Sequence, residues 1–288
     1  MTLDSNEIAT LQGWQGKTES TIDLVTAAPL AGLSATLDRT DPAPTNGTVV
    51  PPLAHWLYFL PQHRQSEIGP DGHAKRGGFL PPVPLPRRMW AGGRLTWQAN
   101  NPLQVGQSVR RESRIERVQH KQGRTGALVF VLVRHEVHNE QGLAITEEHD
   151  IVYRAAADPN ESPPPPQAAA TEAPWHRQWL ADEVMLFRFS ALTFNGHRIH
   201  YDRPYVTQTE GYPGLVVHGP LIATLLVDLW RQQHPLATLT HFAFKALRPT
   251  YDINRFAVCG QPGPDQSARL WAHDHQGWLT MEAQAQWA

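Results

Sequence analysis

The side chains best suited to proton transfer lie close together in residues 189–202, which read Phe-Ser-Ala-Leu-Thr-Phe-Asn-Gly-His-Arg-Ile-His-Tyr-Asp. Two of them are histidines, His197 and His200. An unperturbed imidazole has a pKa of about 6.5, so it can take up and release protons near neutral pH. Asn195 precedes both, but a side-chain amide has no titrating proton in that range and cannot act as a base. The segment therefore predicts a site in which histidine carries the proton transfer.

This segment closely resembles the signature of MaoC-like and (R)-specific enoyl-CoA hydratases, which is Gly-Asp-x-Asn-Pro-(Ile/Leu)-His-x-Asp. Alignment of residues 199–202 with the end of the signature puts His200 on the family's catalytic histidine. Asn195 then falls on its catalytic aspartate, and His197 on its asparagine. The resemblance extends over nearly the whole chain. Residues 211–221 resemble the start of the family's central helix, and residues 86–95, 128–131 and 146–153 resemble the two-domain mesaconyl-CoA (itaconyl-CoA) hydratases and related fatty-acid dehydratases.

The resemblance implies hydration of an enoyl thioester, which needs a base for water, an acid at the α-carbon and donors for the enolate oxygen. Because asparagine stands where the family has aspartate, we expect His200 to take the proton from water and return it to carbon. Asn195 would orient that water. Backbone N–H groups near Gly219, at the N-terminus of the central helix, would hold the enolate oxygen.

Each of these residues also has a structural interpretation. His200 could be a hydrogen-bonded loop histidine, and Asn195 could cap a helix end. A structural role is the stronger expectation for His197. Asp202 is expected to cap a helix, and His218 to hydrogen-bond backbone at the helix entrance. His197, His200 and Asp202 lack a third strong ligand nearby, so no metal site is predicted.

The far carboxylate of a dicarboxylic acyl group would need a cation, and arginine binds carboxylates through paired hydrogen bonds. Arg94, Arg198, Arg203 and Arg248 are the candidates, although each could equally be a solvated surface arginine. Trp90 could form an apolar wall, and Gly93 could let the backbone approach an acyl chain unless it marks a tight turn. The predicted substrate-binding set is Trp90, Gly93, Arg94, His197, Arg198 and Arg248.

The elements around these residues follow a repeated pattern on either side of a proline-rich stretch. Strand-like runs separated by Gly- or Asn-containing turns occur at Arg94–Gln98, Val109–Val118, Leu128–His138 and Ala144–Arg154, and again at His241–Leu247, Arg255–Gly260, Arg269–His273 and Trp278–Trp287. Long runs of this kind favour antiparallel pairing, and their repeated order favours an internal duplication.

Two helices are predicted ahead of the second set of strands. One presents a face made of Val184, Phe187, Ala191 and Phe194, and Asp182 could cap it. The other opens after His218-Gly219-Pro220 and carries Ile222, Leu225, Leu226 and Leu229. It is apolar on most sides, so we expect it to be buried.

The predicted fold class is α+β, a double hot-dog in which two antiparallel sheets are each wrapped around a helix. Residues 1–156 would form an N-terminal hot-dog that binds substrate without catalysing, with its helix shortened to leave room for the acyl tail. Residues 157–174 would be a proline-rich linker. Residues 175–288 would form a C-terminal hot-dog that carries the hydratase motif.

Composition narrows the class of protein. Hydrophobic residues make up 41% and charged residues 18%, as in a folded domain, and a net charge of -2 offers no footprint for nucleic acid. A single cysteine, Cys259, excludes an intrachain disulfide. No apolar run is long enough for a membrane helix and the N-terminus lacks a signal-peptide pattern, so we expect a cytoplasmic protein.

The leading hypothesis is an acyl-CoA hydratase, a hydro-lyase that adds water reversibly to mesaconyl-CoA or itaconyl-CoA and forms citramalyl-CoA. A 3-hydroxyacyl-thioester dehydratase of fatty-acid metabolism would use the same residues. A non-catalytic acyl-CoA-binding protein is the alternative from another class, because asparagine replaces the family aspartate. The expected ligand is an acyl-CoA, with no cofactor, no metal, no nucleic acid and no membrane, and a homodimer is expected.

Overall fold

The computed structural model describes residues 3–123, 126–155 and 165–288. Their strands pair antiparallel in one continuous sheet, in the order β1-β3-β4-β5-β2-β7-β10-β9-β8-β6. The strands are β1 (Thr18–Leu24), β2 (Arg87–Trp97), β3 (Ser108–Gly123), β4 (Gly126–Asn139), β5 (Gly142–Arg154), β6 (Trp175–Trp179), β7 (Leu239–Ala246), β8 (Phe256–Pro262), β9 (Ser267–His273) and β10 (Leu279–Trp287). The eight predicted strand-like runs all lie in strands of this sheet or overlap them. The short edge strands β1 and β6 were not predicted.

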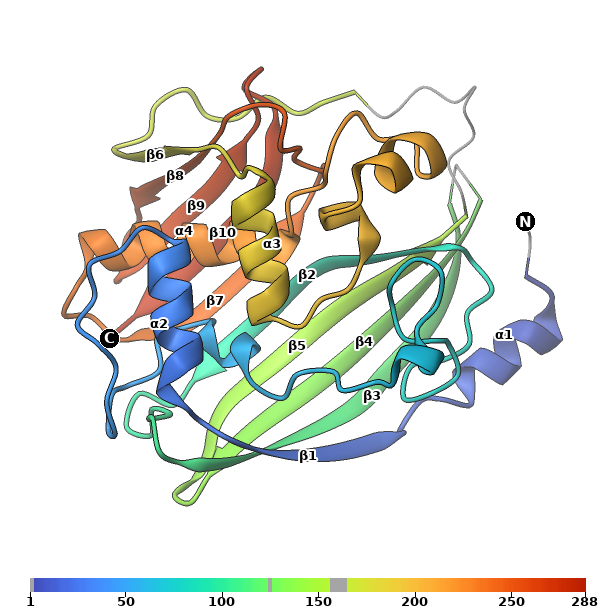
Figure 1. The fold of residues 1–288 in the computed structure, drawn as a ribbon, viewed down its shortest axis with the longest axis horizontal. Coiled ribbons are helices and arrows are strands. Elements are labelled where there is room, and N and C mark those ends of the chain that lie inside the picture. Colours follow the sequence, from blue (N-terminus) through green and yellow to red (C-terminus); the bar gives the residue numbers. More distant parts are fainter. Residues whose placement is uncertain (1–2, 124–125, 156–164) are drawn as a thin grey trace.

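The two halves repeat one topology. The order β1-β3-β4-β5-β2 in the first half corresponds to β6-β8-β9-β10-β7 in the second, and the halves meet where β2 pairs with β7. The double hot-dog prediction is therefore confirmed, with one correction: the two expected sheets are joined edge to edge into a single curved sheet (Figure 1). Of the proposed linker, the structure describes residues 165–174. Residues 157–164 lie outside the described residues.

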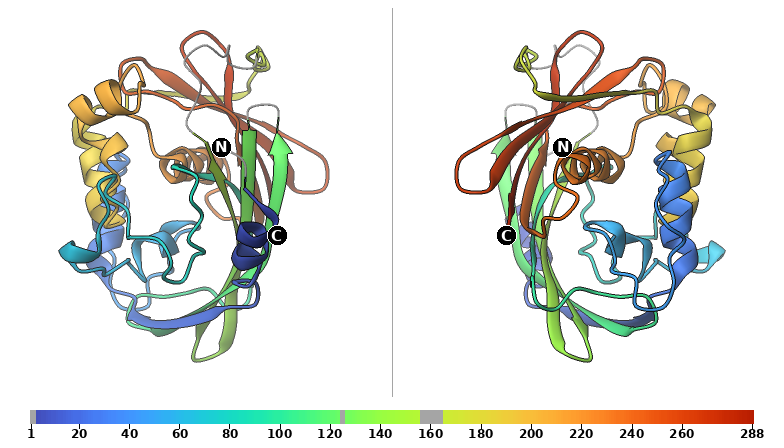
Figure 2. Two further views of the ribbon diagram at one scale, coloured as in Figure 1. Left: turned by 90° about the vertical axis from the view of Figure 1, so that its right-hand side faces the viewer. Right: turned by 90° about the vertical axis from the view of Figure 1, so that its left-hand side faces the viewer.

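The long helix α4 is the centre of the second half. The helices are α1 (Ser5–Gln12), α2 (Ala27–Thr36), α3 (Glu183–Leu192) and α4 (Gly219–Gln233), with short turns η1 (Ala54–Leu57), η2 (Gln65–Glu67), η3 (Arg198–His200) and η4 (Tyr205–Thr209). Leu221 to Trp230 of α4 are all buried, as the sequence predicted. Figure 2 shows α4 nearly end-on within the curve of the sheet.

The first half has no equally long helix among its described residues. Between α2 and β2 the chain forms only the short turns η1 and η2. Figure 2 shows this part of the chain lying across the concave side of the sheet, with α2 beside α3. The expected shortening of the first hot-dog helix is thus observed, and it leaves space between the halves.

The predicted helix around Val184 exists, but its buried face differs from the prediction. Asp182 caps it, since its side chain accepts a hydrogen bond from the Met185 N–H at 2.9 Å. Val184 and Phe187 are 62% and 64% exposed, however, and the buried residues are Met185, Leu186, Phe189 and Ser190. Because α3 packs against α2 instead of inside the sheet, only one narrow side of it is covered.

The convex face of the first-half sheet carries charge. Arg94 on β2 pairs there with Glu148 and Asp150 of β5, at 2.7 Å to Asp150. Neighbouring residues on β5 alternate, so Glu147 and His149 point to the concave side. No helix in the described residues is long and apolar enough to cross a membrane.

Candidate active site

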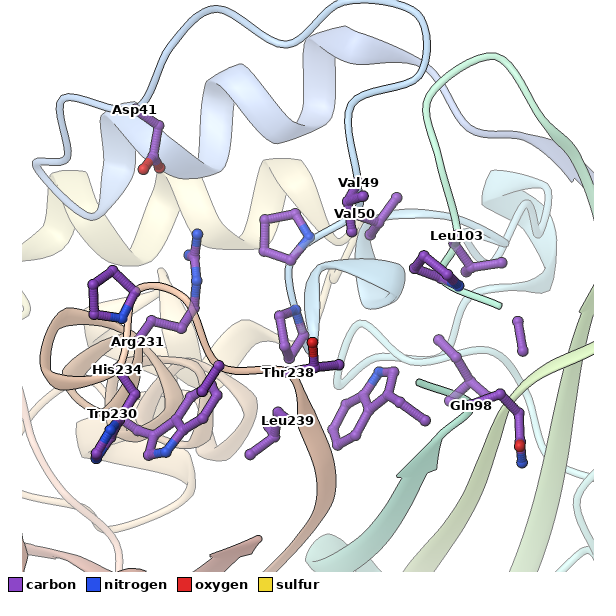
Figure 3. Close-up of a pocket in the computed structure, with 18 of the residues that line it drawn as sticks. Asp41, Val49, Val50, Gln98, Leu103, Trp230, Arg231, His234, Thr238 and Leu239 are labelled. Carbon is purple, nitrogen blue, oxygen red and sulfur yellow. The ribbon is translucent and has the colours of Figure 1, made fainter. Parts of the chain in front are cut away.

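A cavity of about 1680 Å³ lies between the halves, and residues of both line it. It is larger than the ~300–1,000 Å³ of common small-molecule sites, as a large ligand would require. Asn195, His197, His200 and Gly219 all line it. A separate cavity of about 360 Å³ at the far end of α4, lined by Trp230, His234 and others, contains none of the motif residues (Figure 3).

His200 is buried on η3, with 7% of its surface exposed. Its Nδ1 lies 2.7 Å from the Val216 carbonyl oxygen. A carbonyl can only accept, so Nδ1 carries the proton and Nε2 keeps a free lone pair. Burial lowers the pKa of His200 to about 4, which keeps the ring neutral at working pH. His200 is therefore equipped to be a base.

The ring of His218 packs against the ring of His200. The two rings stack with centroids 3.6 Å apart, and His218 Nε2 lies 2.8 Å from the Ser190 hydroxyl. The expected backbone hydrogen bond of its ring is thus wrong: its partner is a side chain on α3. Burial lowers the pKa of His218 well below its ordinary value, so this ring is neutral as well.

Gly219 opens α4 directly after His218. A Cβ added at Gly219 would meet nothing within 4 Å, so open cavity lies in front of the first turn. The first N–H groups of a helix have no intrahelical partner and lie at the positive end of the helix dipole. This turn can therefore receive a developing oxyanion.

Asn195 follows α3 after a sharp turn, in which Phe194 adopts a left-handed φ of 49°. Its Oδ1 accepts a hydrogen bond from the His197 backbone N–H at 3.0 Å. One lone pair of the amide oxygen is thereby engaged, and Nδ2 carries two hydrogens that can donate to a ligand. Because Nδ2 can only donate, Asn195 can orient a lone pair of a ligand but cannot accept its proton.

Asp202 caps the next turn, as predicted. One carboxylate oxygen accepts a hydrogen bond from the Tyr205 N–H at 3.1 Å, and the other pairs with Arg198 at 2.7 Å. Arg198 also stacks on the Tyr205 ring. Both carboxylate oxygens of Asp202 have hydrogen-bond partners within the fold, so its role is structural.

Two residues of the first half, Asp71 and His73, complete the motif and were missed in the sequence. They belong to residues 69–74, here called the docking segment. His73 Nδ1 lies 3.0 Å from Asp71 Oδ2, and the His73 ring contacts the His197 ring in a tilted arrangement with centroids 3.9 Å apart. The tripeptide Asp71-Gly72-His73, an acid and an imidazole around a glycine, is the sequence signal that could have pointed to them.

The structure also brings metal-ligating atoms together where the sequence suggested none. One ligand atom each of Asp71, His73 and His197 lies within 4.8 Å of the others. The prediction that no third ligand lies near His197 is therefore wrong. The additional ligands, Asp71 and His73, come from the docking segment and were not among the residues considered in the sequence. Two histidines and one carboxylate can hold a divalent cation, and the same groups can transfer protons.

A second polar group of residues lines the first-half end of the cavity. We call it the polar wall; its members are His55, Arg111, His135, Glu147 and His149. Glu147 accepts hydrogen bonds from His55 Nε2 at 3.0 Å and from Trp56 Nε1 at 2.9 Å. Burial alone would raise the pKa of Glu147, but the hydrogen bond from His55 and the electrostatic effect of the neighbouring imidazoles together outweigh it and hold the pKa at about 2.

The predicted substrate-binding residues divide into two groups. Trp90 lines the cavity and contacts the His149 ring in a tilted arrangement with centroids 4.0 Å apart. His197, Arg198 and Arg248 line the cavity as well. Arg94 lies on the opposite face of the sheet, as described above, so it cannot reach a ligand in this cavity.

Gly93 lies at the junction of β2 and β7 and does not line the cavity. A Cβ there would come within 3.0 Å of the Glu148 carbonyl oxygen and of the Phe244 ring. The glycine serves close packing of strands. Arg88, which sequence reasoning did not single out, lines the cavity two residues before Trp90.

Comparison with known proteins identifies the family. Residues 53–252 match the model of the family described as hydroxyacyl-thioester dehydratase type 2. The chain is 45% identical to mesaconyl-C(4)-CoA hydratase of Chloroflexus aurantiacus over 88% of this chain and 89% of that protein. It is 27% identical to a mitochondrial hydroxyacyl-thioester dehydratase type 2 of Schizosaccharomyces pombe over 82% and 88% of the two chains.

Solved structures agree on the fold. A MaoC-like dehydratase from Phytophthora capsici superposes with a TM-score of 0.67 at 10% identity, covering 98% of each chain. A Mycobacterium tuberculosis protein with a double hot-dog fold superposes with a TM-score of 0.58 at 11% identity, covering 95% of this chain and 96% of that one.

Fold and site together define a double hot-dog enzyme of the acyl-thioester hydratase/dehydratase class, with its histidine motif in the second half. The chain belongs to the hydroxyacyl-thioester dehydratase type 2 family. The resemblance seen in the sequence is thereby confirmed, and so is the assignment to hydro-lyases.

Proposed function

We propose that this enzyme hydrates mesaconyl-C(4)-CoA reversibly to citramalyl-CoA. The observation that carries the proposal is the 45% identity to a mesaconyl-C(4)-CoA hydratase over nearly the full length of both chains. The buried, neutral His200 with a free Nε2 supplies the base that such a reaction needs.

The chemistry follows from the groups present. His200 Nε2 takes one proton from water while the water oxygen bonds to the β-carbon of the enoyl thioester. The π electrons of the double bond move to form an enolate, whose oxygen is held by the N–H groups at the first turn of α4, near Gly219. The His200 imidazolium then returns the proton to the α-carbon. Dehydration is the reverse sequence.

The polar wall favours a short, polar acyl group over a fatty acyl chain. Charged Arg111 and Glu147 and three imidazoles line the end of the cavity into which a long tail would extend. Burying an aliphatic chain against such groups would remove their hydration without replacing it. A dehydratase of long 3-hydroxyacyl thioesters therefore fits this cavity less well.

The carboxylate of mesaconyl-C(4)-CoA is bonded to the β-carbon, so its counter-ion must lie at the catalytic centre. Arg88 on β2 pairs in register with Tyr153 of β5 and lines the cavity. We assign Arg88 the role of carboxylate partner, since guanidinium matches a carboxylate with two parallel hydrogen bonds.

The test is a substrate panel on the purified enzyme. Mesaconyl-C(4)-CoA, itaconyl-CoA, crotonyl-CoA and a ten-carbon enoyl-CoA are incubated in parallel, and loss of enoyl-thioester absorbance and product mass are followed. Fastest turnover of mesaconyl-C(4)-CoA is expected, and Arg88→Met should slow it more than crotonyl-CoA. Binding without turnover of any substrate would leave only an acyl-CoA-binding protein.

We also propose that the enzyme needs no cofactor, works as a homodimer and resides in the cytoplasm. The side chains described suffice for the proton transfers. Full activity after dialysis against a chelator, and a solution mass twice that of the chain, are the expected results.

A further inference from the structure

The attacking water needs a second hydrogen-bond acceptor besides His200. A water molecule has two hydrogens, and His200 Nε2 can accept only one of them. The family signature places an aspartate where this chain has Asn195. Asn195 Oδ1 is engaged by the His197 N–H at 3.0 Å, and its Nδ2 only donates. A residue from elsewhere in the chain that presents a fixed lone pair to the motif would meet this need.

The docking segment brings such a group to the motif. Its backbone holds it there: the Arg198 N–H donates to the Asp71 carbonyl oxygen at 2.9 Å, and the Arg198 guanidinium donates to the Pro70 carbonyl oxygen at 3.0 Å. Gly72, with a φ of 89°, lies so close to Gly196 that a Cβ would come within 1.8 Å of its carbonyl oxygen.

The His73 ring reaches the motif histidines. Both His73 and His197 line the main cavity, and the His197 centroid lies 3.9 Å from His73 and 5.4 Å from His200. Only 20% of the His73 side chain is exposed. His73 is thus close enough to share a ligand with the motif.

Asp71 decides which His73 nitrogen can accept. Its Oδ2 lies 3.0 Å from His73 Nδ1 and its Oδ1 accepts the His73 backbone N–H at 3.0 Å. Hydrogen bonds from His73 hold the pKa of Asp71 below its ordinary value against the opposing effect of burial, so this carboxylate is ionised. An ionised carboxylate can only accept, hence His73 Nδ1 carries the proton and Nε2 has the free lone pair.

We propose that His73 is a second catalytic residue, which holds the attacking water through Nε2, and that Asp71 is a positioning residue that fixes its tautomer. This inference rests on the proposed function. One water hydrogen goes to His200 Nε2 as a proton. The other stays on oxygen, bonded to His73 Nε2, and becomes the hydroxyl hydrogen of the product. His73 undergoes no net change.

The arrangement resembles the way a carboxylate orients a catalytic histidine in hydrolases, where replacing the aspartate by asparagine imposes the wrong tautomer. In Asp71→Asn, the amide oxygen can keep the backbone hydrogen bond while the NH₂ group faces Nδ1. The proton then moves to Nε2, and the acceptor is lost although His73 is still present.

The experiment compares His73→Ala, Asp71→Asn and the control Lys75→Ala. Lys75 belongs to the same loop, but its side chain bonds to the Ser66 carbonyl oxygen. Both kcat and KM for mesaconyl-C(4)-CoA hydration are measured, together with the melting temperature. His73→Ala and Asp71→Asn should each lower kcat by about 30-fold or more, because the attacking water is then poorly positioned, with KM within about threefold. Lys75→Ala should retain wild-type rates.

Three results would overturn the proposal. One is a kcat within threefold of wild type in either variant. Another is a loss of activity in both variants that is fully accounted for by a smaller amount of folded protein. The third is wild-type activity that disappears on chelation and returns with a divalent cation, which would make Asp71, His73 and His197 metal ligands. The wild-type enzyme is measured in the same assay. If it does not hydrate mesaconyl-C(4)-CoA, the proposed function fails, and this result is distinct from an unchanged kcat in the variants.

Discussion

At the scale of single residues, the environment of His200 decides what it can do. Its Nδ1 is committed to the Val216 carbonyl, and its ring lies against His218. Burial disfavours the charged ring, so the neutral base dominates over the whole physiological range. The protonated form that arises during the reaction is correspondingly acidic, which favours return of the proton to carbon.

The pH dependence of activity follows from the pKa of His200, which burial lowers to about 4. The active form is the deprotonated one, so kcat/KM should be level near neutral pH and should fall as the pH drops through about 5 to 4. Initial rates between pH 4 and 8 test this. An acid limb centred near pH 6.5 would show instead an exposed, unperturbed histidine.

Asn195 and His73 should compensate for one another. If His73 supplies the acceptor that a family aspartate would provide, then Asn195→Asp in a His73→Ala background should raise kcat by about 10-fold or more. The same change in a His200→Ala background should raise kcat less, because the new carboxylate would have to deprotonate the water without the imidazole that returns the proton to carbon. Equal effects in the two backgrounds would contradict this division of roles.

At the scale of elements, the sequence predicted what depends on local pattern. The buried helix α4, its start after His218 and the long strands all follow from periodicity and turn residues. The motif residues His200 and Asn195 were placed by their resemblance to the family signature. The contact of the docking segment with the motif could not be predicted, because apart from one isolated bridge between Ile68 and Ala74 the segment has no regular structure, and its partner lies in the other half of the chain.

Arg94 was predicted to bind the substrate, but it does not line the cavity. Its position four residues after Trp90 suggested a role in the cavity, and plain alternation would put both side chains on one face. The β-bulge between Trp90 and Gly92 shifts the register by one residue, so Arg94 lies on the opposite face, among carboxylates of β5. The face of a strand depends on tertiary register, which the isolated sequence does not specify. The same alternation would have pointed to Arg88, which shares the face of Trp90.

The contact between the docking segment and the motif can be tested with two matched glycines. Gly72 and Gly77 both have positive φ, of 89° and 93°, so alanine strains the backbone similarly at each. Only at Gly72 would the Cβ overlap the Gly196 carbonyl, whereas at Gly77 the nearest atom is 3.8 Å away. Gly72→Ala should lose at least about 10-fold in kcat, as misplacement of a catalytic group does. Gly77→Ala should not; similar rates in the two variants would contradict the model of docking.

At the scale of the whole molecule, the proposed active site lies where two halves of the same topology meet. In the proposal, the second half supplies the base and the helix terminus, and the first supplies the docking segment and the polar wall. Joining β2 to β7 fixes the halves relative to one another. This explains why the first half can lack a long central helix: the chain there lines a cavity instead of filling it.

The enclosed histidines should make the fold sensitive to acid. Burial lowers the pKa of His135 to about 4, of His149 to about 3 and of His200 to about 4. In the unfolded chain they titrate near 6.5, so between pH 6.5 and 4 unfolding takes up protons and stability falls as the pH falls. Each histidine contributes at most about 1.4 kcal/mol per pH unit. Urea unfolding at pH 7 and 5 should show a loss of at least about 2 kcal/mol in total; equal stabilities would refute the buried, neutral state of these rings.

The most direct measurement is hydration of mesaconyl-C(4)-CoA by wild type and His200→Ala, with circular dichroism confirming that both are folded. His200 is the sole proton acceptor in the proposed step, so its removal should lower kcat by about 100-fold or more. A folded His200→Ala enzyme that retains a kcat within tenfold of wild type would contradict a site built around this residue.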